Sequence, residues 1–370
     1  MKALPWYALN STSSCISPSL LVYPERIAHN IGLMIRIAGG TEYLRPHVKT
    51  HKMAEVILMK LEAGIRKFKC ATIAEAELLG SCGAPDVLIA LQPVGPNLER
   101  FLQLQDIFPQ TSFSTIVDDS EVGSNLDQMA GEKGLKALVY MDINVGMNRT
   151  GISPDTRGYR LFKELCSLPH LGVKGFHVYD GHIRHPDPAE RAIACDTAFS
   201  PVLDLKGQLE SEGYSVKGIV AGGSPSFPIH ARRNGVETSP GTTLLWDENY
   251  ADTFPDMPFL PAAVLLSRII SKPGERLLCL DLGHKAVAPE MPFPRVRLLG
   301  MEECEQLSQS EEHLVVQCPS TETYRPGDAC YALPMHICPT VAKYPAVYTV
   351  KSGELTGSWK VAARDHRISI

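Results

Sequence analysis

Long apolar segments are missing from this sequence. No stretch approaches the roughly 20 unbroken apolar residues that a membrane-spanning helix needs, although 44% of the 370 residues are hydrophobic. The N-terminal segment MKALPWYALNSTSS has neither the continuous apolar core nor the clear cleavage site of a secretory signal. We therefore expect a cytoplasmic protein that has no membrane partner.

An excess of positive charge is also missing. Lys and Arg together number 36 against 41 Asp and Glu, so the formal net charge is -5 and the pI is near 6.2. The one dense basic cluster is the octet RPHVKTHK at residues 45–52. This balance argues against a general surface for polyanions, and we expect no nucleic-acid partner.

The ten cysteines form no CxxC pair. A chain of this length does not need disulfides to complete its core, so we expect reduced thiols, most of them small buried apolar residues. Cys338 differs from the rest because His336 precedes it by two residues. Imidazole and thiolate are a favourable ligand pair for zinc, but this spacing alone fits a buried structural pair equally well.

Short apolar runs alternate with longer amphipathic ones between residues 20 and 250. FKCATI is followed by AEAELLGSCG, and DVLIAL is followed by NLERFLQLQDIF. Repeated strand and helix units of this kind indicate a parallel sheet, and their number favours a closed eight-stranded barrel. We therefore predict an α/β protein whose residues 20–250 form a (β/α)8 barrel of the TIM type.

The pattern changes near residue 250. The proline-rich segment DTFPDMPFLPAAV is followed by short β-type runs such as RLLCLDLG, HLVVQC and AVYTVKSG, with few helical stretches between them. We predict a second, mainly antiparallel β domain at residues 251–370. Residues 1–19 are expected to pack on it.

Polar clusters follow several of the predicted barrel strands. The segments are RPHVKTHK, MDINVGMNRTGI, AGGSPSFP and SPGTTLLWD. Active sites of such barrels lie where the strands end. The last two segments are glycine- and hydroxyl-containing loops, whose N–H and O–H groups suit a phosphate. Each segment alone also fits an ordinary loop.

These segments, together with CLDLGHKAV, SEEHLVVQ and GDACYALPMHICPTV, occur in the order seen in the D-threonine aldolase and D-serine dehydratase family. The sequence resembles that family from about residue 20 to 350. The family belongs to the alanine-racemase-like, fold-type III enzymes that use pyridoxal 5'-phosphate. The octet and PMHICPT are the most specific parts of the resemblance.

The resemblance implies that Lys49 binds pyridoxal phosphate covalently, with His47 beside it. A lysine must lose its proton to attack an aldehyde, and neighbouring cations and partial burial both favour the neutral amine. By the same resemblance Arg149 lies near the phenolic oxygen of the cofactor. The implied phosphate-binding residues are Gly222, Gly223, Ser224, Gly241 and Thr242.

The resemblance also implies that His336 and Cys338 hold a divalent metal ion. Zinc fits these ligands best, and manganese and magnesium are the alternatives. The ion would act as a Lewis acid on the β-hydroxyl group of a D-3-hydroxy amino acid. The implied enzyme is a lyase whose substrate is a small D-amino acid, and the family implies a homodimer.

Two reactions are open to such a site. Retro-aldol cleavage yields glycine and an aldehyde, whereas dehydration yields a 2-oxo acid and ammonia. A cysteine at the position of Cys338 is typical of the dehydratases for D-serine or D-3-hydroxyaspartate. The segment VYDGHIRHPDPAERA is more similar to the aldolases, and in that alignment Tyr179 and His185 line the site and His185 acts as a base.

We favour the D-threonine aldolase-like activity. His182 competes with His185 for the role of base, and His185 also fits a loop histidine that caps the following helix. An amino-acid racemase would need a second base from a partner subunit and no metal pair. A non-catalytic pyridoxal-phosphate carrier would be shorter and would lack the C-terminal β domain.

Overall fold

The computed structural model describes residues 5–370, which fall into two compact units. The β unit comprises the chain up to Leu33, Thr50–Val56 and Thr242–Arg364. The barrel unit comprises Met34–Lys49, Ile57–Gly241 and Asp365–Ile370. Each unit is described separately below.

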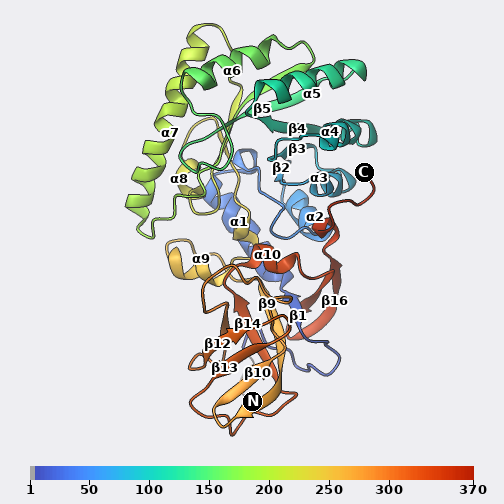
Figure 1. Ribbon diagram of the computed structural model, residues 1–370, viewed down its shortest axis with the longest axis vertical. Coiled ribbons are helices and arrows are strands. Elements are labelled where there is room, and N and C mark those ends of the chain that lie inside the picture. Colours follow the sequence, from blue (N-terminus) through green and yellow to red (C-terminus); the bar gives the residue numbers. More distant parts are fainter. Residues whose placement is uncertain (1–4) are drawn as a thin grey trace. The chain divides into compact units, whose positions relative to one another are not determined.

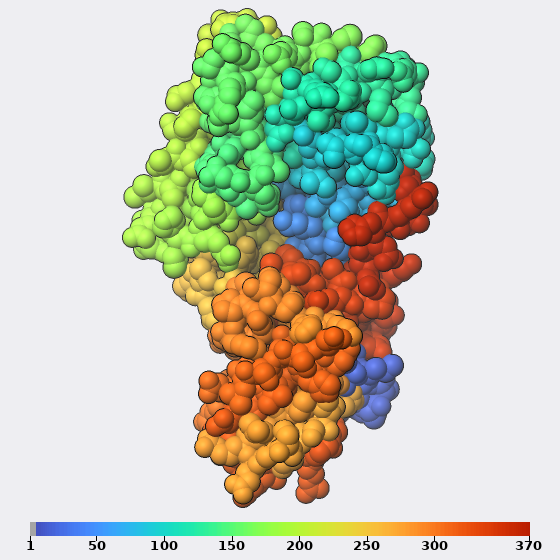
Figure 2. All heavy atoms as spheres, in the orientation of Figure 1, coloured from blue at the N-terminus to red at the C-terminus, as the bar shows by residue number. Residues whose placement is uncertain are grey.

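The barrel unit contains a seven-stranded parallel sheet whose strands follow one another in chain order (Figure 1). The strands are β2 (Lys67–Cys70), β3 (Asp86–Ile89), β4 (Ser112–Val117), β5 (Ala137–Ile143), β6 (Leu171–Val178), β7 (Gly218–Ala221) and β8 (Val236–Thr238). The helices between them are α3 (Ile73–Ser81), α4 (Pro96–Ile107), α5 (Ser120–Glu132), α6 (Thr156–Ser167), α7 (Pro188–Ser211) and α8 (Phe227–His230). In Figure 2 the atoms of this unit on the face in view are mainly those coloured from blue through cyan and green to yellow-green.

Residues 44–48 take the place of an eighth strand between β8 and β2. The Arg45 N–H donates to the carbonyl of Thr238 at 2.8 Å, and the Val48 N–H donates to that of Lys69 at 2.9 Å. The predicted barrel of the TIM type is thus confirmed. The octet is nevertheless not a regular strand, because Pro46 has no N–H to donate and a turn begins at Lys49. The expected alternation of basic side chains therefore does not run through the whole octet.

Local sequence signals determine where several barrel helices begin. The hydroxyl of Thr72 accepts a hydrogen bond from the N–H of Glu75 at the start of α3. Asp119 caps α5 in the same manner. Asp187 caps α7, and Pro188 occupies the first turn, where its missing N–H costs nothing. These caps end the loops that follow β2, β4 and β6.

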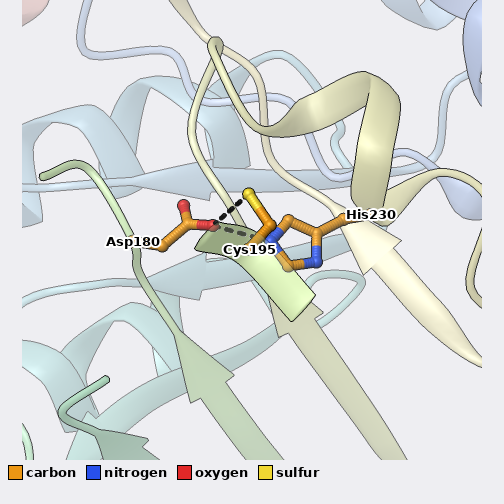
Figure 3. A group of neighbouring side chains, drawn as sticks. All are labelled: Asp180, Cys195 and His230. Atoms are coloured by element: carbon orange, nitrogen blue, oxygen red, sulfur yellow. Dashed lines mark hydrogen bonds and ion pairs between the residues drawn. The ribbon is translucent and has the colours of Figure 1, made fainter. Parts of the chain in front are cut away.

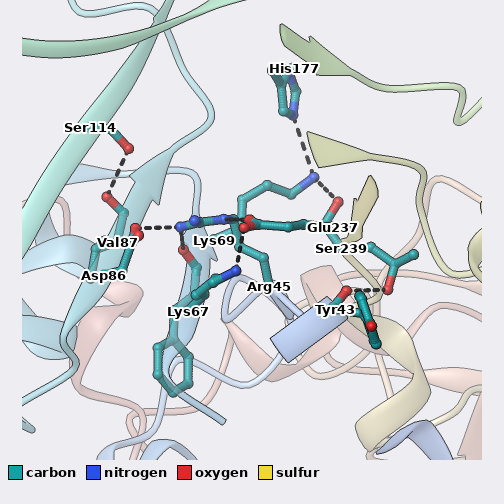
Figure 4. A network of polar contacts seen from close by, with 12 residues as sticks. Tyr43, Arg45, Lys67, Lys69, Asp86, Val87, Ser114, His177, Glu237 and Ser239 are labelled. Atoms are coloured by element: carbon teal, nitrogen blue, oxygen red, sulfur yellow. Dashed lines mark hydrogen bonds and ion pairs between the residues drawn. The ribbon is translucent and has the colours of Figure 1, made fainter. Parts of the chain in front are cut away.

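Arg45 lies in a buried ion-pair network of the barrel unit (Figure 4). Its side chain is 1% exposed and donates to Asp86 Oδ1 at 2.6 Å and to Glu237 Oε2 at 2.7 Å. Although burial disfavours its charge, the hydrogen bond with Asp86 and the negative charges of Glu237 and Asp86 raise the pKa of Arg45 above its ordinary value. Arg45 therefore joins β8 and β3 through its side chain.

Replacing Arg45 by methionine should destabilise the protein. Asp86 and Glu237 would lose a buried partner, although Glu237 would keep Lys67, and removing one member of a buried ion pair costs about 3 kcal/mol or more. Urea unfolding followed by circular dichroism measures the effect. Arg157→Met is the matched control, because Arg157 and Asp155 pair at side-chain exposures of 69% and 51%, where an ion pair contributes less than about 1 kcal/mol. Equal losses in both variants would contradict the prediction.

The β unit is built on a nine-stranded sheet that is antiparallel except where β1 (Ser19–Val22) pairs with β15 (Ala346–Lys351). The predicted second, mainly antiparallel domain is thus confirmed. The other strands are β9 (Ala263–Gly274), β10 (Leu277–Leu280), β11 (Val296–Leu299), β12 (Glu305–Gln309), β13 (Leu314–Gln317), β14 (Ala329–Pro334) and β16 (Glu354–Lys360). The remaining α-helices are α1 (Pro24–Ala38), α2 (Ala54–Glu62), α9 (Glu248–Thr253) and α10 (Ile337–Val341). Leu21, Val264, Leu266 and Val350 belong to a buried apolar cluster of this unit.

The expectation that the cysteines are all reduced is wrong for one pair. Cys304 and Cys318 form a disulfide with an S–S distance of 2.07 Å. They adjoin the paired residues Glu305 and Gln317 at the ends of β12 and β13, so strand pairing brings them together. Five of the other cysteines are buried as expected, namely Cys15, Cys70, Cys195, Cys279 and Cys330. Among the described residues, no helix has the length and apolar character of a membrane span.

Candidate cofactor and metal sites

Three basic side chains of the barrel unit lie within 6 Å of the centre of the Tyr179 ring. Tyr179 directly follows β6, and its ring centroid lies 4.8 Å from the guanidinium carbon of Arg149. Lys49 Nζ lies 5.8 Å and Lys69 Nζ 5.6 Å from the same centroid. Three of the predicted site residues, Lys49, Tyr179 and Arg149, are therefore brought together. Sequence reasoning missed Lys69, which lies within strand β2, of sequence KFKC.

Lys49 stands where the barrel-closing segment turns. Its side chain is half-buried, and its backbone N–H donates to His47 Nδ1 at 3.2 Å. His47 is buried and its own N–H donates to the carbonyl of Pro240 at 2.9 Å. His47 thus joins the backbone beside Lys49 to the loop that follows β8.

The loops after β7 and β8 form a tight support beside Tyr179. Gly222 has a φ of +79°, and a Cβ there would lie 2.8 Å from the ring of His230. A Cβ at Gly223 would lie 3.1 Å from the Tyr179 ring. The hydroxyl of Ser224 accepts from the N–H of Gly241 at 3.1 Å, which joins the two loops. The positive φ and the close contact favour glycine at Gly222, and a side chain at Gly223 would require the Tyr179 ring to shift.

Three backbone N–H groups expected at a phosphate are already used within the barrel unit. The N–H of Gly222 donates to Val178 O at 2.9 Å, and that of Gly223 donates to Ser226 Oγ at 3.1 Å. The N–H of Gly241 donates to Ser224. An amine, an aromatic ring, an arginine and a glycine loop with hydroxyls still form a donor set that fits pyridoxal phosphate. The phosphate would then be held by other groups than these three amides.

Asp180 supports the glycine loop from behind. Its carboxylate accepts from Ser226 Oγ at 2.6 Å and from His230 Nε2 at 2.7 Å, and the thiol of Cys195 approaches it at 3.8 Å (Figure 3). Asp180, Cys195 and His230 are buried and lie close enough together to hold a metal ion. Burial and the charge of Asp180 raise the pKa of the Cys195 thiol to about 12. A carboxylate that already accepts two hydrogen bonds fits a hydrogen-bonded support of the glycine loop.

His336 and Cys338 lie in an acidic part of the β unit. His336 is the N-cap residue of α10, and its Nδ1 lies 2.5 Å from Glu290 Oε1. Cys338 Sγ lies 3.1 Å from the hydroxyl oxygen of Thr50 and 3.5 Å from that of Thr242. The predicted phosphate ligand Thr242 is thus next to the predicted metal ligand Cys338. Nitrogen, sulfur and carboxylate groups together form a donor set that fits zinc.

The charges around His336 favour a cation. Burial alone would lower its pKa, but the hydrogen bond and charge of Cys338, the charge of Asp247 and the hydrogen bond with Glu290 outweigh burial and raise the pKa to about 9. Asp247 is buried and accepts a hydrogen bond from the N–H of Ile337 at 3.1 Å. Asp247 is the last residue of the segment SPGTTLLWD, so the signal for it lay in a motif already noted.

The two candidate histidines of the loop before α7 have different surroundings. The side chain of His185 is exposed, and its carbonyl accepts from Arg191 NH1 at 2.8 Å. His182 is also exposed, but its Nε2 lies 3.2 Å from the position of a Cβ on Gly146. Gly146 belongs to the loop that carries Arg149. His182 is therefore next to the loop that carries Arg149, whereas His185 contacts Arg191 through its carbonyl.

Comparison with known families decides the relationship of the chain. Residues 22–247 match the alanine racemase N-terminal domain, and residues 262–350 match a putative serine dehydratase domain. The chain belongs to the alanine racemase N-terminal domain family. The resemblance inferred from the sequence motifs is thereby confirmed. Enzymes of this family use pyridoxal phosphate.

The chain is similar to aldolases and a dehydratase that act on D-amino acids, and the similarity extends over most of the length of each. The chain is 27% identical over 327 residues to a D-threonine aldolase from Arthrobacter sp, which covers 87% of the chain and 85% of that protein. A D-threonine aldolase structure from Filomicrobium marinum has a TM-score of 0.87 at 23% identity, covering 94% of this chain and 95% of that one. The D-threo-3-hydroxyaspartate dehydratase from Delftia sp. HT23 has a TM-score of 0.81 at 20% identity, with coverages of 94% and 97%.

Variant structures of D-threo-3-hydroxyaspartate dehydratase concern a histidine and a cysteine two positions apart in its sequence. Each residue is replaced by alanine, and the cysteine variant is described as being in the metal-free form. These names describe that dehydratase.

Proposed function

We propose that this protein is a lyase that depends on pyridoxal phosphate and a divalent metal ion and cleaves D-3-hydroxy amino acids to glycine and an aldehyde. Its activity would be that of a D-threonine aldolase. The observation that carries the proposal is the donor pair His336 and Cys338, accompanied by Glu290 and Asp247. A racemase acts without a β-hydroxyl on its substrate and has no need for such a pair.

Each polar part of the cofactor has a candidate partner in the barrel unit. Lys49 would bond to the aldehyde carbon, and the guanidinium group of Arg149, which only donates hydrogen bonds, would hold the phenolic oxygen. The ring of Tyr179 would pack against the cofactor, and His47 would orient the backbone of Lys49. The Ser224 hydroxyl, with Gly222, Gly223 and Gly241 giving room, would hold the phosphate. The bound cofactor supplies an electron sink for the bond that breaks at Cα.

The metal ion would be held by His336 and Cys338, with zinc as the expected ion. When bound, it would supply Lewis acidity for the substrate's β-hydroxyl group. The thiol of Cys338 must ionise to act as a ligand. The hydroxyl groups of Thr50 and Thr242 lie within hydrogen-bond distance of its sulfur and would stabilise the thiolate.

His182 is the better candidate for the base that removes the β-hydroxyl proton. It lies beside the loop of Arg149, whereas His185 has an exposed side chain and contacts Arg191 of α7 through its carbonyl. We expect His182→Ala to lower kcat/KM for D-threonine by about 10²-fold or more, the usual contribution of a positioned base. His185→Ala is the matched control and should change it less than about threefold. The reverse order of effects would return the role to His185.

The reaction itself is tested by product analysis. The protein, loaded with pyridoxal phosphate and zinc or manganese, is incubated with D-threonine, D-serine and D-3-hydroxyaspartate, and with L-threonine as the stereochemical control. We expect glycine and acetaldehyde from D-threonine and no reaction with L-threonine. Racemisation of alanine without any turnover of the D-3-hydroxy amino acids would reject the proposal.

Dehydration is the second candidate because of one specific observation. The second residue of the proposed metal pair is a cysteine, as in the D-threo-3-hydroxyaspartate dehydratase whose cysteine variant is metal-free. A 2-oxo acid and ammonia from D-serine or D-3-hydroxyaspartate, without glycine, would identify this activity.

A further inference from the structure

Lys69 is a buried lysine that the proposed function leaves without a role. It lies on β2, is 2% exposed, and points into the barrel toward β6 and β8 (Figure 4). Its Nζ forms a short hydrogen bond with Ser239 Oγ and lies 3.5 Å from His177 Nε2. Ser239 follows β8 directly, and His177 belongs to β6.

The directions of these hydrogen bonds follow from the next neighbours. Ser239 Oγ lies 2.7 Å from the carbonyl oxygen of Gly222, to which only its proton can be donated, so it accepts from Lys69. His177 Nδ1 lies 2.6 Å from Asp142 Oδ1. A neutral imidazole that donates from Nδ1 accepts at Nε2, and burial lowers the pKa of His177 despite the charge of Asp142 and the hydrogen bond to it. Lys69 thus donates to both neighbours.

These two hydrogen bonds leave one position on the Lys69 nitrogen. In the neutral amine this position is a lone pair, which accepts a hydrogen bond. In the ammonium ion it is a third N–H, which donates one. A single proton therefore converts Lys69 from an acceptor into a donor, while both bonds to Ser239 and His177 are kept.

The groups around Lys69 set its pKa so that this change of protonation occurs near neutral pH. Burial is the largest effect, and together with the positive charge of Lys49 it lowers the pKa of Lys69 to about 7. The carboxylates of Asp142 and Asp180 oppose the shift, and Arg149 adds to it. Lys69 is consequently charged below about pH 7 and neutral above it.

The pyridine nitrogen of pyridoxal phosphate changes between acceptor and donor in the same way as Lys69. A pyridine nitrogen accepts a hydrogen bond when neutral and donates one when protonated. The aldehyde, the phenolic oxygen and the phosphate already have candidate partners in Lys49, Arg149 and the glycine loops. Lys69 faces the same Tyr179 ring as Lys49 and Arg149.

We propose that Lys69, held in place by Ser239 and by the His177–Asp142 pair, is the hydrogen-bond partner of the pyridine nitrogen and shares one proton with it. This inference rests on the proposed function, since it requires bound pyridoxal phosphate. It assigns a cofactor-binding role to Lys69 and positioning roles to Ser239, His177 and Asp142. The proton state of the ring, and with it the cofactor's capacity as an electron sink, would then be set by Lys69.

The test uses the full-length protein loaded with pyridoxal phosphate labelled with ¹⁵N in the ring. The ¹⁵N resonance and the visible absorption band are followed from pH 5 to pH 9 in the wild type, Lys69→Met and Lys69→Arg. Lys60→Met is the matched control. Lys60 is equally buried, and burial lowers its pKa to about 7. It lies on α2, however, where its Nζ is 5.3 Å from the ring of Phe68.

We expect the wild type and Lys60→Met to show one common titration of the ring nitrogen near neutral pH. Lys69→Met should keep the visible band, because Lys49 is intact, but its titration midpoint should move by about one pH unit or more, and its affinity for the cofactor should fall up to about tenfold. Lys69→Arg cannot release its proton and should leave the ring nitrogen unprotonated throughout the range.

Two results contradict the inference in distinguishable ways. If both Lys69 variants bind the cofactor and titrate with the wild-type midpoint, Lys69 is not the partner of the nitrogen and the proposed function stands. If the wild-type protein binds no pyridoxal phosphate, the proposed function and this inference are overturned together. The Arg variant keeps the first test available if Lys69→Met does not fold.

Discussion

Replacing Lys49 by alanine should abolish the visible absorption band of bound pyridoxal phosphate and lower lyase activity by about 10³-fold or more. No other side chain of residues 44–49 carries the primary amine that must condense with the aldehyde. Absorption spectroscopy after reconstitution with excess cofactor measures the loss of the band, and a product assay measures the loss of activity.

Lys52→Ala is the control for this experiment. Lys52 belongs to the same basic octet, but its Nζ donates to the carbonyl of Ala363 at 3.4 Å, a contact within the β unit. This variant should keep the band and most of the activity. A band that persists in Lys49→Ala would show that the cofactor is attached elsewhere, with Lys69 as the first residue to test.

Removal of the proposed metal ligands should have an effect of similar size. The double variant His336→Ala and Cys338→Ala should lose about one bound divalent ion per chain and about 10³-fold in activity, while the band due to Lys49 remains. The loss follows because the remaining groups, Glu290 and Asp247, are oxygen donors that hold zinc poorly without nitrogen or sulfur. Elemental analysis of the purified protein measures the metal content.

Cys195→Ala distinguishes the two candidate metal sites. Cys195 belongs to the cluster with Asp180 and His230, in which Asp180 already accepts hydrogen bonds from Ser226 and His230. We therefore expect this variant to keep the wild-type metal content. Metal lost from Cys195→Ala but kept in the double variant would transfer the metal site to the barrel unit.

The pattern of the chain was sufficient to predict the architecture. Alternating strand-like and helix-like segments indicated the parallel barrel, because a parallel sheet requires a crossover after every strand. The octet, the glycine loops and PMHICPT were visible because each concentrates unusual residues within a few positions. Lys49 comes from the octet, Arg149 from MDINVGMNRTGI and Tyr179 from VYDGHIRHPDPAERA. In the structure both basic side chains lie near the Tyr179 ring.

Other features depend on pairings that no local pattern records. The disulfide joins cysteines 14 residues apart only because β12 and β13 pair in a particular register. Asp180 looked like an ordinary member of the segment VYDGHIRH, and His230 lies 50 residues away. Their contact supports the glycine loop, and it exists because β6 and β7 are neighbours in the sheet.

The sequence by itself determined which reactive groups the protein carries and which ends of strands present them, because side-chain chemistry and strand order are written along the chain. Tertiary structure alone decided which of those groups are buried together. Lys69 and Ser239 are 170 residues apart and meet because residues 44–48 close the ring between β8 and β2. Burial in that closed barrel is the largest effect that brings the pKa of this lysine to about 7, since a charge that loses its water is stabilised only by the partners that the fold supplies.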